Sequence, residues 1–226
     1  GGVHSTDTYG GAGGGGGYYG GGAGGSNYGV DNNAGEGGGN EASELAVARA
    51  LEWLAKHQNP NGSWSFTHLN RRCPCPNHGS LPNALNGATA MALLPFLGAG
   101  HTHKDGKHKE TVNRGLYFLL NRQNPNSGSL YEPAGTMYSH GLASIVLCEA
   151  FAMTQDKNLQ GPAQGAVNFI VYAQDPIGGG WRYAPQSPGD TSAVGWQLMA
   201  LKSARMAYLQ VPDRVFVGVT RFLDSV

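Results

Sequence analysis

Four stretches of the chain place their apolar residues on one side of a helix. In residues 41–58 the apolar positions repeat with a period of about 3.6 residues. These positions are Val47, Ala50, Leu51, Trp53 and Leu54. Similar stretches follow at 110–123, 163–174 and 213–226. The pattern predicts four amphipathic helices, the first of them capped by Asn40 or Ser43.

Between these stretches lie three runs of more uniformly apolar sequence, at about 87–97, 139–153 and 191–208. Small residues are frequent in them, and small residues allow helices to approach one another closely. They include Ala88, Ala90, Ala92, Gly141, Ala143, Ser144, Ala193, Gly195 and Ala200. The runs therefore predict an inner layer of helices. No stretch alternates apolar and polar residues as a strand does, so the predicted fold class is all-α.

Three of the amphipathic stretches end in a shared motif. An aromatic residue and an aliphatic one are followed, after three residues, by Gln, then by Asn or Asp, Pro, a turn with Gly and a large apolar residue. The three glutamines are Gln58, Gln123 and Gln174. A long motif that recurs in this way indicates a repeat architecture.

Each position of the motif has a structural role. The aromatic–aliphatic pair anchors the outer helix on its neighbour, and Gln can satisfy free backbone groups at the helix end. Asn-Pro or Asp-Pro stops the helix, Gly supplies the tight turn, and the following Trp or Tyr packs back over it. We therefore interpret the motif as scaffold and look for a site elsewhere.

The motif resembles the QW motif of squalene and hopene cyclases. The first and third copies match it closely, whereas the second carries Leu130 where Trp is expected. The resemblance covers residues 41–226. It implies the α/α-toroid of terpenoid cyclases and protein prenyltransferases, in which helical hairpins line a cavity with their inner helices.

The resemblance also implies an incomplete ring, with about three hairpins and one further outer helix. Phe222-Leu223 aligns with Trp53-Leu54, so the next Gln would fall just after Val226. We therefore expect a partial or open toroid that belongs to a longer protein. An apolar helix face exposed at its end would favour self-association.

Residues 1–40 differ from the rest of the chain in composition, because glycine dominates and apolar side chains are few. Such a segment cannot bury enough surface to offset the entropy lost on ordering. We predict a disordered, flexible linker at 1–40 and the repeat domain at 41–226. A self-associating tract of Tyr and Gly is the alternative for the first segment.

The charge of the chain argues against two classes of partner. The 226 residues have a formal net charge of zero and a pI near 7.2. A neutral chain exerts no strong electrostatic attraction on nucleic acid or an anionic membrane. No apolar stretch approaches the roughly 18 residues of a membrane span. The first residue is Gly1, so the chain is read as processed or excerpted, and its compartment is left open.

The N-terminal ends of the inner helices should gather at one end of a toroid, because inner and outer helices alternate in direction. The segments concerned are 86–89, 138–141 and 189–192. Positive helix ends favour anions, and Tyr138 and His140 add hydrogen-bond donors. We predict Tyr138, His140, Thr191 and Trp196 as cavity or ligand-binding residues. Aromatic faces there could stabilise a carbocation, and packing in the core is the alternative.

The resemblance points to one candidate acid. Class II terpenoid cyclases protonate a double bond with an Asp in an Asp-x-Asp-Asp-Thr-Ala run, and Asp190-Thr191 resembles its last Asp-Thr pair. Gly189 occupies the proton-donating position. Asp190 is therefore the candidate catalytic residue, with helix capping as the alternative. Protein prenyltransferases bind zinc through Asp-x-Cys, and Ser192 stands here in place of that Cys, which argues against prenyl transfer.

The interval between Gln58 and Gln123 is longer than the next one, and the extra length carries Cys73, Cys75 and His78. Two thiolates and an imidazole could hold a structural zinc ion, with His68 as a fourth ligand. A disulfide or free thiols are the alternative. Cys148 is expected to be a core thiol. The connector with His101, His103 and His108 is expected to be a solvated loop.

The sequence leaves three functions open. The first is a non-catalytic repeat module that binds an apolar ligand, such as an isoprenoid, or a protein segment in its concave inner face. The second is an enzyme similar to squalene and hopene cyclases that acts on a polyprenyl substrate. The third is a surface structural protein in which the Gly-rich tract tethers the repeat.

Overall fold

A computed structural model describes residues 40–67 and 79–226. Regular structure in these residues is helical, and β geometry is confined to an isolated bridge between Glu132 and Thr136. The helices are α1 (Glu41–Lys56), α2 (Leu85–Gly98), α3 (Lys109–Arg122), α4 (Thr136–Thr154), α5 (Lys157–Ala173), α6 (Thr191–Met206) and α7 (Asp213–Leu223). The predicted all-α fold is therefore confirmed. The linker predicted for 1–40 lies outside the described residues except for Asn40.

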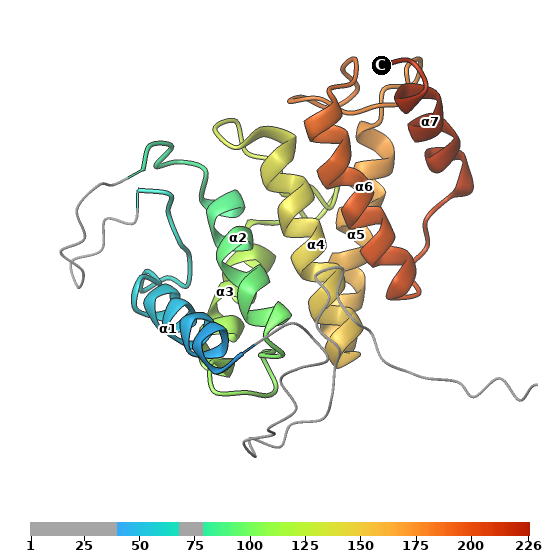
Figure 1. Cartoon of the computed structure of the whole chain (residues 1–226). Coiled ribbons are helices and arrows are strands. Elements are labelled where there is room, and N and C mark those ends of the chain that lie inside the picture. The colour runs from blue at the N-terminus through green and yellow to red at the C-terminus, as the bar shows by residue number, and fades with distance from the viewer. Residues whose placement is uncertain (1–39, 68–78) are drawn as a thin grey trace, which may run out of the picture.

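The helices form two layers (Figure 1). The inner layer consists of α2, α4 and α6, which stand side by side with α4 in the middle. In the outer layer α3 packs on α2, while α5 packs on α4 and α6. Helices α1 and α7 flank the row against α2 and α6. This alternation of amphipathic outer helices and small-residue inner helices is the predicted α/α-toroid arrangement.

One helix boundary differs from the sequence pattern, and one is confirmed. Helix α5 begins at Lys157, well before the predicted start at 163, because the Asp156 side chain accepts a hydrogen bond from Asn158 N at 3.0 Å. The helix continues through Pro162, which the pattern alone would place at a helix start. At α1 the expected cap is confirmed, since Asn40 and Ser43 bond each other's backbone N–H reciprocally at 2.9 Å.

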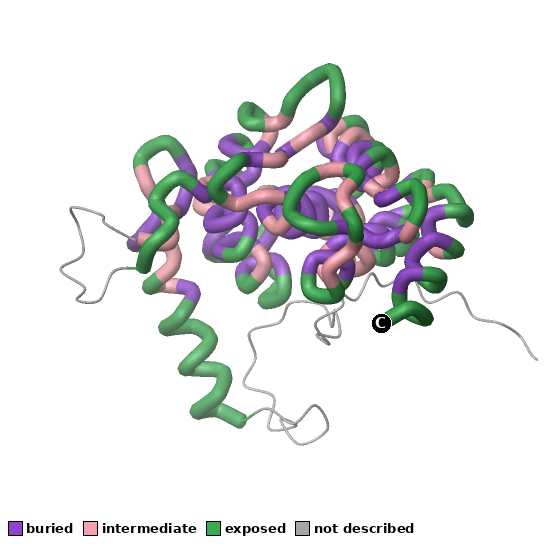
Figure 2. The backbone as a smooth tube through the Cα atoms, turned by 90° about the horizontal axis from the view of Figure 1, so that it is seen from above, coloured by how far each residue is buried: buried purple, intermediate pink, exposed green. Residues whose placement is uncertain are grey.

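Helix α1 buries less than its pattern predicts. Residues 41–50 are exposed along their whole length, and Figure 2 shows this part of the helix projecting from the body. Val47 is 48% exposed and Trp53 is 42% exposed, whereas Leu51 is buried. The prediction that α1 packs its apolar face on neighbouring helices is therefore wrong for the first half of the helix. An amphipathic pattern indicates that a helix has an apolar face but not that this chain covers it.

The glutamines of the repeated motif join neighbouring hairpins. Each Gln side chain donates one hydrogen bond to the carbonyl of its own turn and one to a carbonyl in the next outer helix. The pairs are Gln58 with Gly62 and Thr111, Gln123 with Gly128 and Pro162, and Gln174 with Gly179 and Val215, all at 2.8–2.9 Å. The motif therefore fixes the position of one hairpin on the next, in addition to ending its own helix.

The glycine of each turn makes a second contact between neighbouring hairpins. Gly62, Gly128 and Gly179 all have positive φ, at 89°, 73° and 81°. A β-carbon added to any of them would lie within 2.3 Å of a backbone oxygen of the next outer helix. Those oxygens belong to Arg114, Gly165 and Gly218. Glycine is thus required here by conformation and by space.

The apolar residue after the turn closes the motif, as predicted. Trp64 donates its indole N–H to Leu54 O and Trp181 donates to Ile170 O, both at 2.8 Å. In the second copy Leu130 takes this place and is fully buried. The second turn therefore keeps the packing of the motif without the indole hydrogen bond.

The connector between α2 and α3 is the expected solvated loop only in part, because residues 104–107 are exposed whereas two of its histidines are buried. His101 and His108 are 7% and 8% exposed, and their rings meet edge to face at 5.0 Å. The His108 ring also lies 5.1 Å from Phe96. Burial lowers the pKa of both imidazoles. His103 binds Asp156 at 2.9 Å and so ties the connector to α5.

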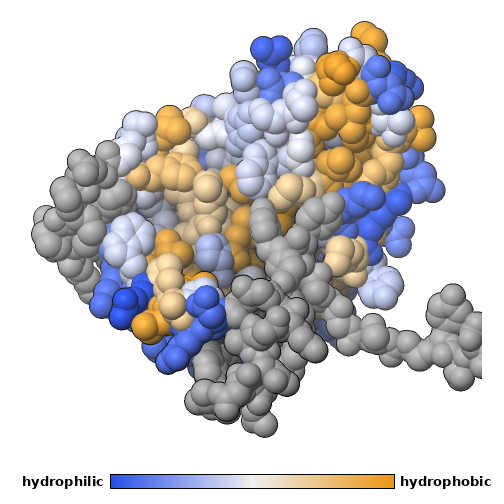
Figure 3. All heavy atoms as spheres, in the orientation of Figure 1, coloured by the Kyte–Doolittle hydropathy of each residue, from blue (hydrophilic) through white to orange (hydrophobic). Residues whose placement is uncertain are grey.

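Apolar side chains gather on the surface over α6 and α7 (Figure 3). Val217 and Leu223 of α7 are 61% and 42% exposed. This agrees with the expectation of an apolar helix face at this end of the repeat row. Whether it mediates self-association stays a prediction.

Candidate ligand-binding cavity

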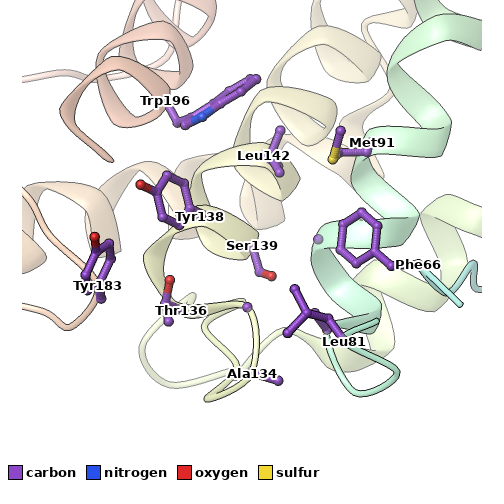
Figure 4. A pocket seen from close by; sticks show the side chains of 13 residues that line it. Phe66, Leu81, Met91, Ala134, Thr136, Tyr138, Ser139, Leu142, Tyr183 and Trp196 are labelled. Atoms are coloured by element: carbon purple, nitrogen blue, oxygen red, sulfur yellow. The ribbon is translucent and has the colours of Figure 1, made fainter. Parts of the chain in front are cut away.

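A cavity of about 480 Å³ opens on the inner face of the helical row. Side chains from all three inner helices contribute to its wall (Figure 4). Tyr138 and Leu142 of α4 lie in the middle, with Met91 of α2 on one side and Trp196 of α6 on the other. The other lining residues are Phe66, Leu81, Ala84, Gly87, Ala134, Gly135, Thr136, Ser139 and Tyr183.

The wall is mainly apolar and its rim is open to solvent. Leu81, Met91 and Tyr183 are 53%, 47% and 45% exposed, although all three contribute to the cavity. Ala84 and Gly87 are small lining residues, and their short side chains leave open space in this part of the cavity. An apolar concavity with a few polar groups is typical of a small-molecule site.

Two lining residues have a strained backbone. Leu81 and Thr136 have φ values of 62° and 55°, which side chains other than glycine rarely adopt. For a β-branched residue such as Thr136 the conformation is especially unfavourable. Strain of this kind costs about 1–3 kcal/mol per residue and tends to cluster at ligand sites.

A chain of hydrogen bonds connects the cavity wall to Asp190. The Tyr138 hydroxyl lies 2.5 Å from Ser192 Oγ, and Ser192 Oγ donates to Asp190 Oδ1 at 2.6 Å. Asp190 also accepts the backbone N–H groups of Ser192 and Ala193 at 3.1 and 3.2 Å. Of the predicted site residues, the structure therefore brings Tyr138, Trp196 and Asp190 to the same end of the inner layer.

The surroundings of Asp190 oppose the role of a general acid. The hydrogen bond from Ser192 is the main cause that lowers the pKa of its carboxyl, followed by the bond from Ala193 N. An acid that protonates a double bond needs a raised pKa in a dry pocket. The arrangement is that of a helix cap, the alternative weighed from the sequence. Neighbouring Gly189 lies under the Phe222 ring.

His140 and Thr191 do not line the cavity. His140 is fully buried, and its Nδ1 accepts a hydrogen bond from Leu130 N at 3.0 Å while its Nε2 lies 3.1 Å from Ala166 O. Burial lowers its pKa to about 4, so the ring is neutral near pH 7. Through these contacts His140 connects α4 to α5 and to the turn that follows α3. Thr191 is exposed at the start of α6.

Glu132 is the residue that sequence reasoning missed. It is 4% exposed and sits under the cavity floor at the N-terminus of α2. Its carboxylate accepts Asn86 N at 3.1 Å, Gly87 N at 3.0 Å and the Ser139 hydroxyl at 2.6 Å. The anion expected at the gathered helix ends is here supplied by the protein itself. In the sequence, Glu132 is a single Glu shortly before a predicted inner helix, and this pattern is too common to identify a buried carboxylate.

We expect Glu132→Ala to destabilise the fold by about 2 kcal/mol, because buried N–H and O–H groups would lose their acceptor. Chemical denaturation followed by circular dichroism measures the effect. Glu110→Ala, at an exposed first-turn position of α3, is the matched control and should change stability by only a few tenths of a kcal/mol. Equal losses in the two variants would contradict the structural role of Glu132.

The zinc prediction concerns residues that the structure leaves undescribed, namely Cys73, Cys75, His78 and His68. Within 40–67 and 79–226 no group of three or more metal-binding side chains is found. Cys148 is a buried free thiol whose pKa is raised by burial, as expected for a core cysteine. Within the same residues no helix is both long and apolar enough to cross a bilayer.

Comparison with known proteins agrees with the motif. The family model described as the squalene-hopene cyclase C-terminal domain matches residues 40–211. The chain is 27% identical over 181 residues to the squalene–hopene cyclase of Bradyrhizobium diazoefficiens, which covers 71% of this chain and 26% of that protein. It is 28% identical over 179 residues to the squalene–hopene cyclase of Zymomonas mobilis subsp. mobilis, covering 70% of this chain and 26% of that protein. The chain thus spans about a quarter of these curated relatives. No solved structure matches it.

Proposed function

The chain belongs to the squalene-hopene cyclase C-terminal domain family, and on that premise we propose that it is a repeat module that binds an apolar ligand in its concave inner face without cyclising it. The observation that carries this proposal is the open apolar cavity between α2, α4 and α6. A molecule of isoprenoid size fits its volume of about 480 Å³. The two strained residues on its wall support a binding role.

The acid groups near the cavity support binding over catalysis. Asp190 and Glu132 each accept three hydrogen bonds, and both hold the start of an inner helix. The hydrogen bonds to Asp190 lower the pKa of its carboxyl, so near neutral pH it is ionised and carries no proton to donate. The lining contains no Asp, Glu or His among the described residues. The aromatic faces of Tyr138 and Trp196 would then contribute contact area to a bound ligand.

Cyclase activity is the second candidate, because both relatives above are named squalene–hopene cyclases. In that case Asp190 would act with groups outside the described residues. Incubation of the protein with squalene, followed by mass spectrometry of the extract, tests this directly. Turnover that disappears in Asp190→Asn would replace our proposal with the catalytic one.

The binding proposal predicts a specific loss in Met91→Glu. A carboxylate on the apolar wall should weaken binding of farnesol or squalene at least about tenfold, because a charge would lose water when the ligand enters. Quenching of tryptophan fluorescence is a suitable measurement, since Trp196 lines the cavity. The substitution should leave folding intact, as Met91 is 47% exposed.

Met206→Glu is the matched control. Met206 is also 47% exposed, lies at the end of α6 and is not part of the cavity. Its variant should bind as the unmodified chain does, and so should Asp190→Ala. Equal loss in both Met variants, or no binding of either probe to the unmodified chain, would overturn the cavity as a ligand site and leave a protein partner as the candidate.

A further inference from the structure

Outer helices α3 and α5 each receive the preceding hairpin at two carbonyls in a fixed register. The first carbonyl, bonded by the preceding Gln, lies twelve residues before the Gln that ends the same helix. The second, which the preceding turn glycine approaches, lies nine residues before that Gln. The first carbonyls belong to Thr111 and Pro162, and the second to Arg114 and Gly165.

Helix α1 repeats this register. It ends at Gln58, so the same two spacings lead to the carbonyls of Ala46 and Arg49. The cap of α1, Asn40, lies eighteen residues before its Gln, and the cap of α5, Asp156, lies eighteen residues before the Gln of α5. Both carbonyls fall in the exposed, projecting half of α1 (Figure 2). The helix thus has the layout of one that receives a hairpin.

The apolar face of α1 occupies positions that are buried in the other outer helices. Val47 is 48% exposed, whereas Val112 of α3 and Ala163 of α5, in the same register, are fully buried. One turn later Ala50 is exposed, while its counterpart in α3, Gly115, is buried. Covering this face with a further helix would remove apolar surface from water and so be favourable.

The cover on α3 comes from the hairpin that precedes it. A β-carbon added to Gly115 would lie 2.7 Å from Leu93 of α2 and 3.0 Å from the Trp64 ring of the first Gln turn. Helix α5 is covered in the same way by the second Gln turn and by α4. A partner that fits the exposed half of α1 therefore consists of a Gln turn and the inner helix that follows it.

Arg49 adds a polar group to this surface. In the same register of α3, the Arg114 guanidinium donates a hydrogen bond to Gln58 Oε1, while the nitrogen of that amide bonds Thr111 O. Arg49 is exposed and makes no hydrogen bond or ion pair with the residues that the structure describes. A Gln that donates to Ala46 O would bring its amide oxygen to the Arg49 guanidinium.

We propose that the exposed half of α1 is a docking surface for a helical hairpin of the same repeat type on a partner chain. The Gln turn of that hairpin binds Ala46 O and Arg49, and its inner helix covers Val47 and Ala50. This proposal goes beyond ligand binding and is independent of the cavity.

Other occupants fit this surface less well. Residues 1–39 contain no Gln. In a second copy of this chain, all three Gln turns bind the next outer helix of their own row. The inner helix α4 is joined to α5 by two residues only, 155 and 156, whereas the Gly-rich residues 1–39 directly precede the cap of α1. We therefore place the hairpin on a separate chain.

The test attaches a probe hairpin to the full chain. The probe is a second copy of residues 109–155, which carry α3, its Gln turn and α4 and which cover α5 in the fold. It is fused before residue 1, so residues 1–39 connect it to α1 and give it an effective concentration of about 1 mM. With a dissociation constant of about 0.1 mM, amide exchange in residues 41–50 should slow about tenfold, as measured by hydrogen–deuterium exchange and mass spectrometry.

Two variants of the fusion separate the proposed contact from other contacts. Gly128→Ala in the probe copy alone prevents the close approach of its turn and should abolish the slowing. Arg49→Ala removes the donor to the incoming Gln and should reduce the slowing about fivefold, measured against the same substitution in the unfused chain. Arg214→Ala, at an exposed position of α7, is the matched control and should leave the slowing unchanged.

Two results would overturn the docking surface. The first is exchange in residues 41–50 that the probe does not change. The second is slowing that persists in both the Gly128→Ala and the Arg49→Ala fusions, because the probe would then be held by contacts other than the Gln turn. Neither result bears on ligand binding in the cavity, which is measured separately.

Discussion

Gly128→Ala should destabilise the repeat domain by about 3–5 kcal/mol, the largest effect we expect from a single methyl group. Gly128 has a φ of 73°, which alanine adopts only with strain. The added β-carbon would also lie 2.1 Å from the Gly165 carbonyl oxygen, so the turn must separate from α5. The Gln123 side chain donates one hydrogen bond to the turn and one to α5, so separating the turn from α5 would also distort these two bonds.

Gly195→Ala is the matched control for this prediction. Gly195 lies inside α6, and a β-carbon placed there meets no atom within 4 Å other than the nearby backbone of its own helix. Alanine should therefore stabilise the helix by up to about 1 kcal/mol. Urea denaturation followed by circular dichroism gives both values. A loss below about 1 kcal/mol for Gly128→Ala would contradict the close approach of turn and helix.

Acidification from pH 7 to pH 4 should remove about 3 kcal/mol of stability through His140 alone. The pKa of this buried ring is about 4 in the fold, below the ordinary 6.5 of the unfolded chain. Between these two values the unfolded chain binds the additional proton, so the free energy of unfolding falls as pH falls. Well above pH 6.5 neither state is protonated and the contribution is constant.

Other groups titrate in the same range, including His101 and His108, so the measurement needs a variant without the ring. His140→Thr is suitable because Thr89 accepts the equivalent Trp64 N–H in the first hairpin, at 3.0 Å. The stability difference between the unmodified chain and this variant should shrink by about 3 kcal/mol between pH 7 and pH 4. A difference that stays constant with pH would show that His140 is accessible to water in the fold.

The fold was largely predictable because its signals are local and repeated. Gln58, Gln123 and Gln174 mark three helix ends, and small residues such as Gly141 distinguish the inner helices. The error at α1 arose because a periodic pattern does not show which neighbour covers it. The error at His101 and His108 arose because a polar connector can be buried when its side chains stack on Phe96 and on each other.

The candidate site was predictable only in part. Tyr138 and Trp196 were identified because they lie near the start of inner helices, and both contribute to the cavity. His140 is only two residues after Tyr138 in sequence but points to a different side of α4, toward Ala166 of α5. The hydrogen bonds that Glu132 and Asp190 accept depend on distances that are set by packing. No spacing in the sequence contains that information.

The joints made by the glutamines have a consequence for how such a protein can change over generations. Each Gln bonds main-chain carbonyls in the next outer helix, and the residues that supply them are as different as Thr111, Pro162 and Val215. Because these hydrogen bonds are made to the main chain, the residue that supplies the carbonyl can be substituted without losing the bond. Hairpins linked in this way can be duplicated, deleted or exchanged by recombination, and the new junction will still close. Selection is then free to remodel the inner helices, and with them the cavity, without rebuilding the outer shell.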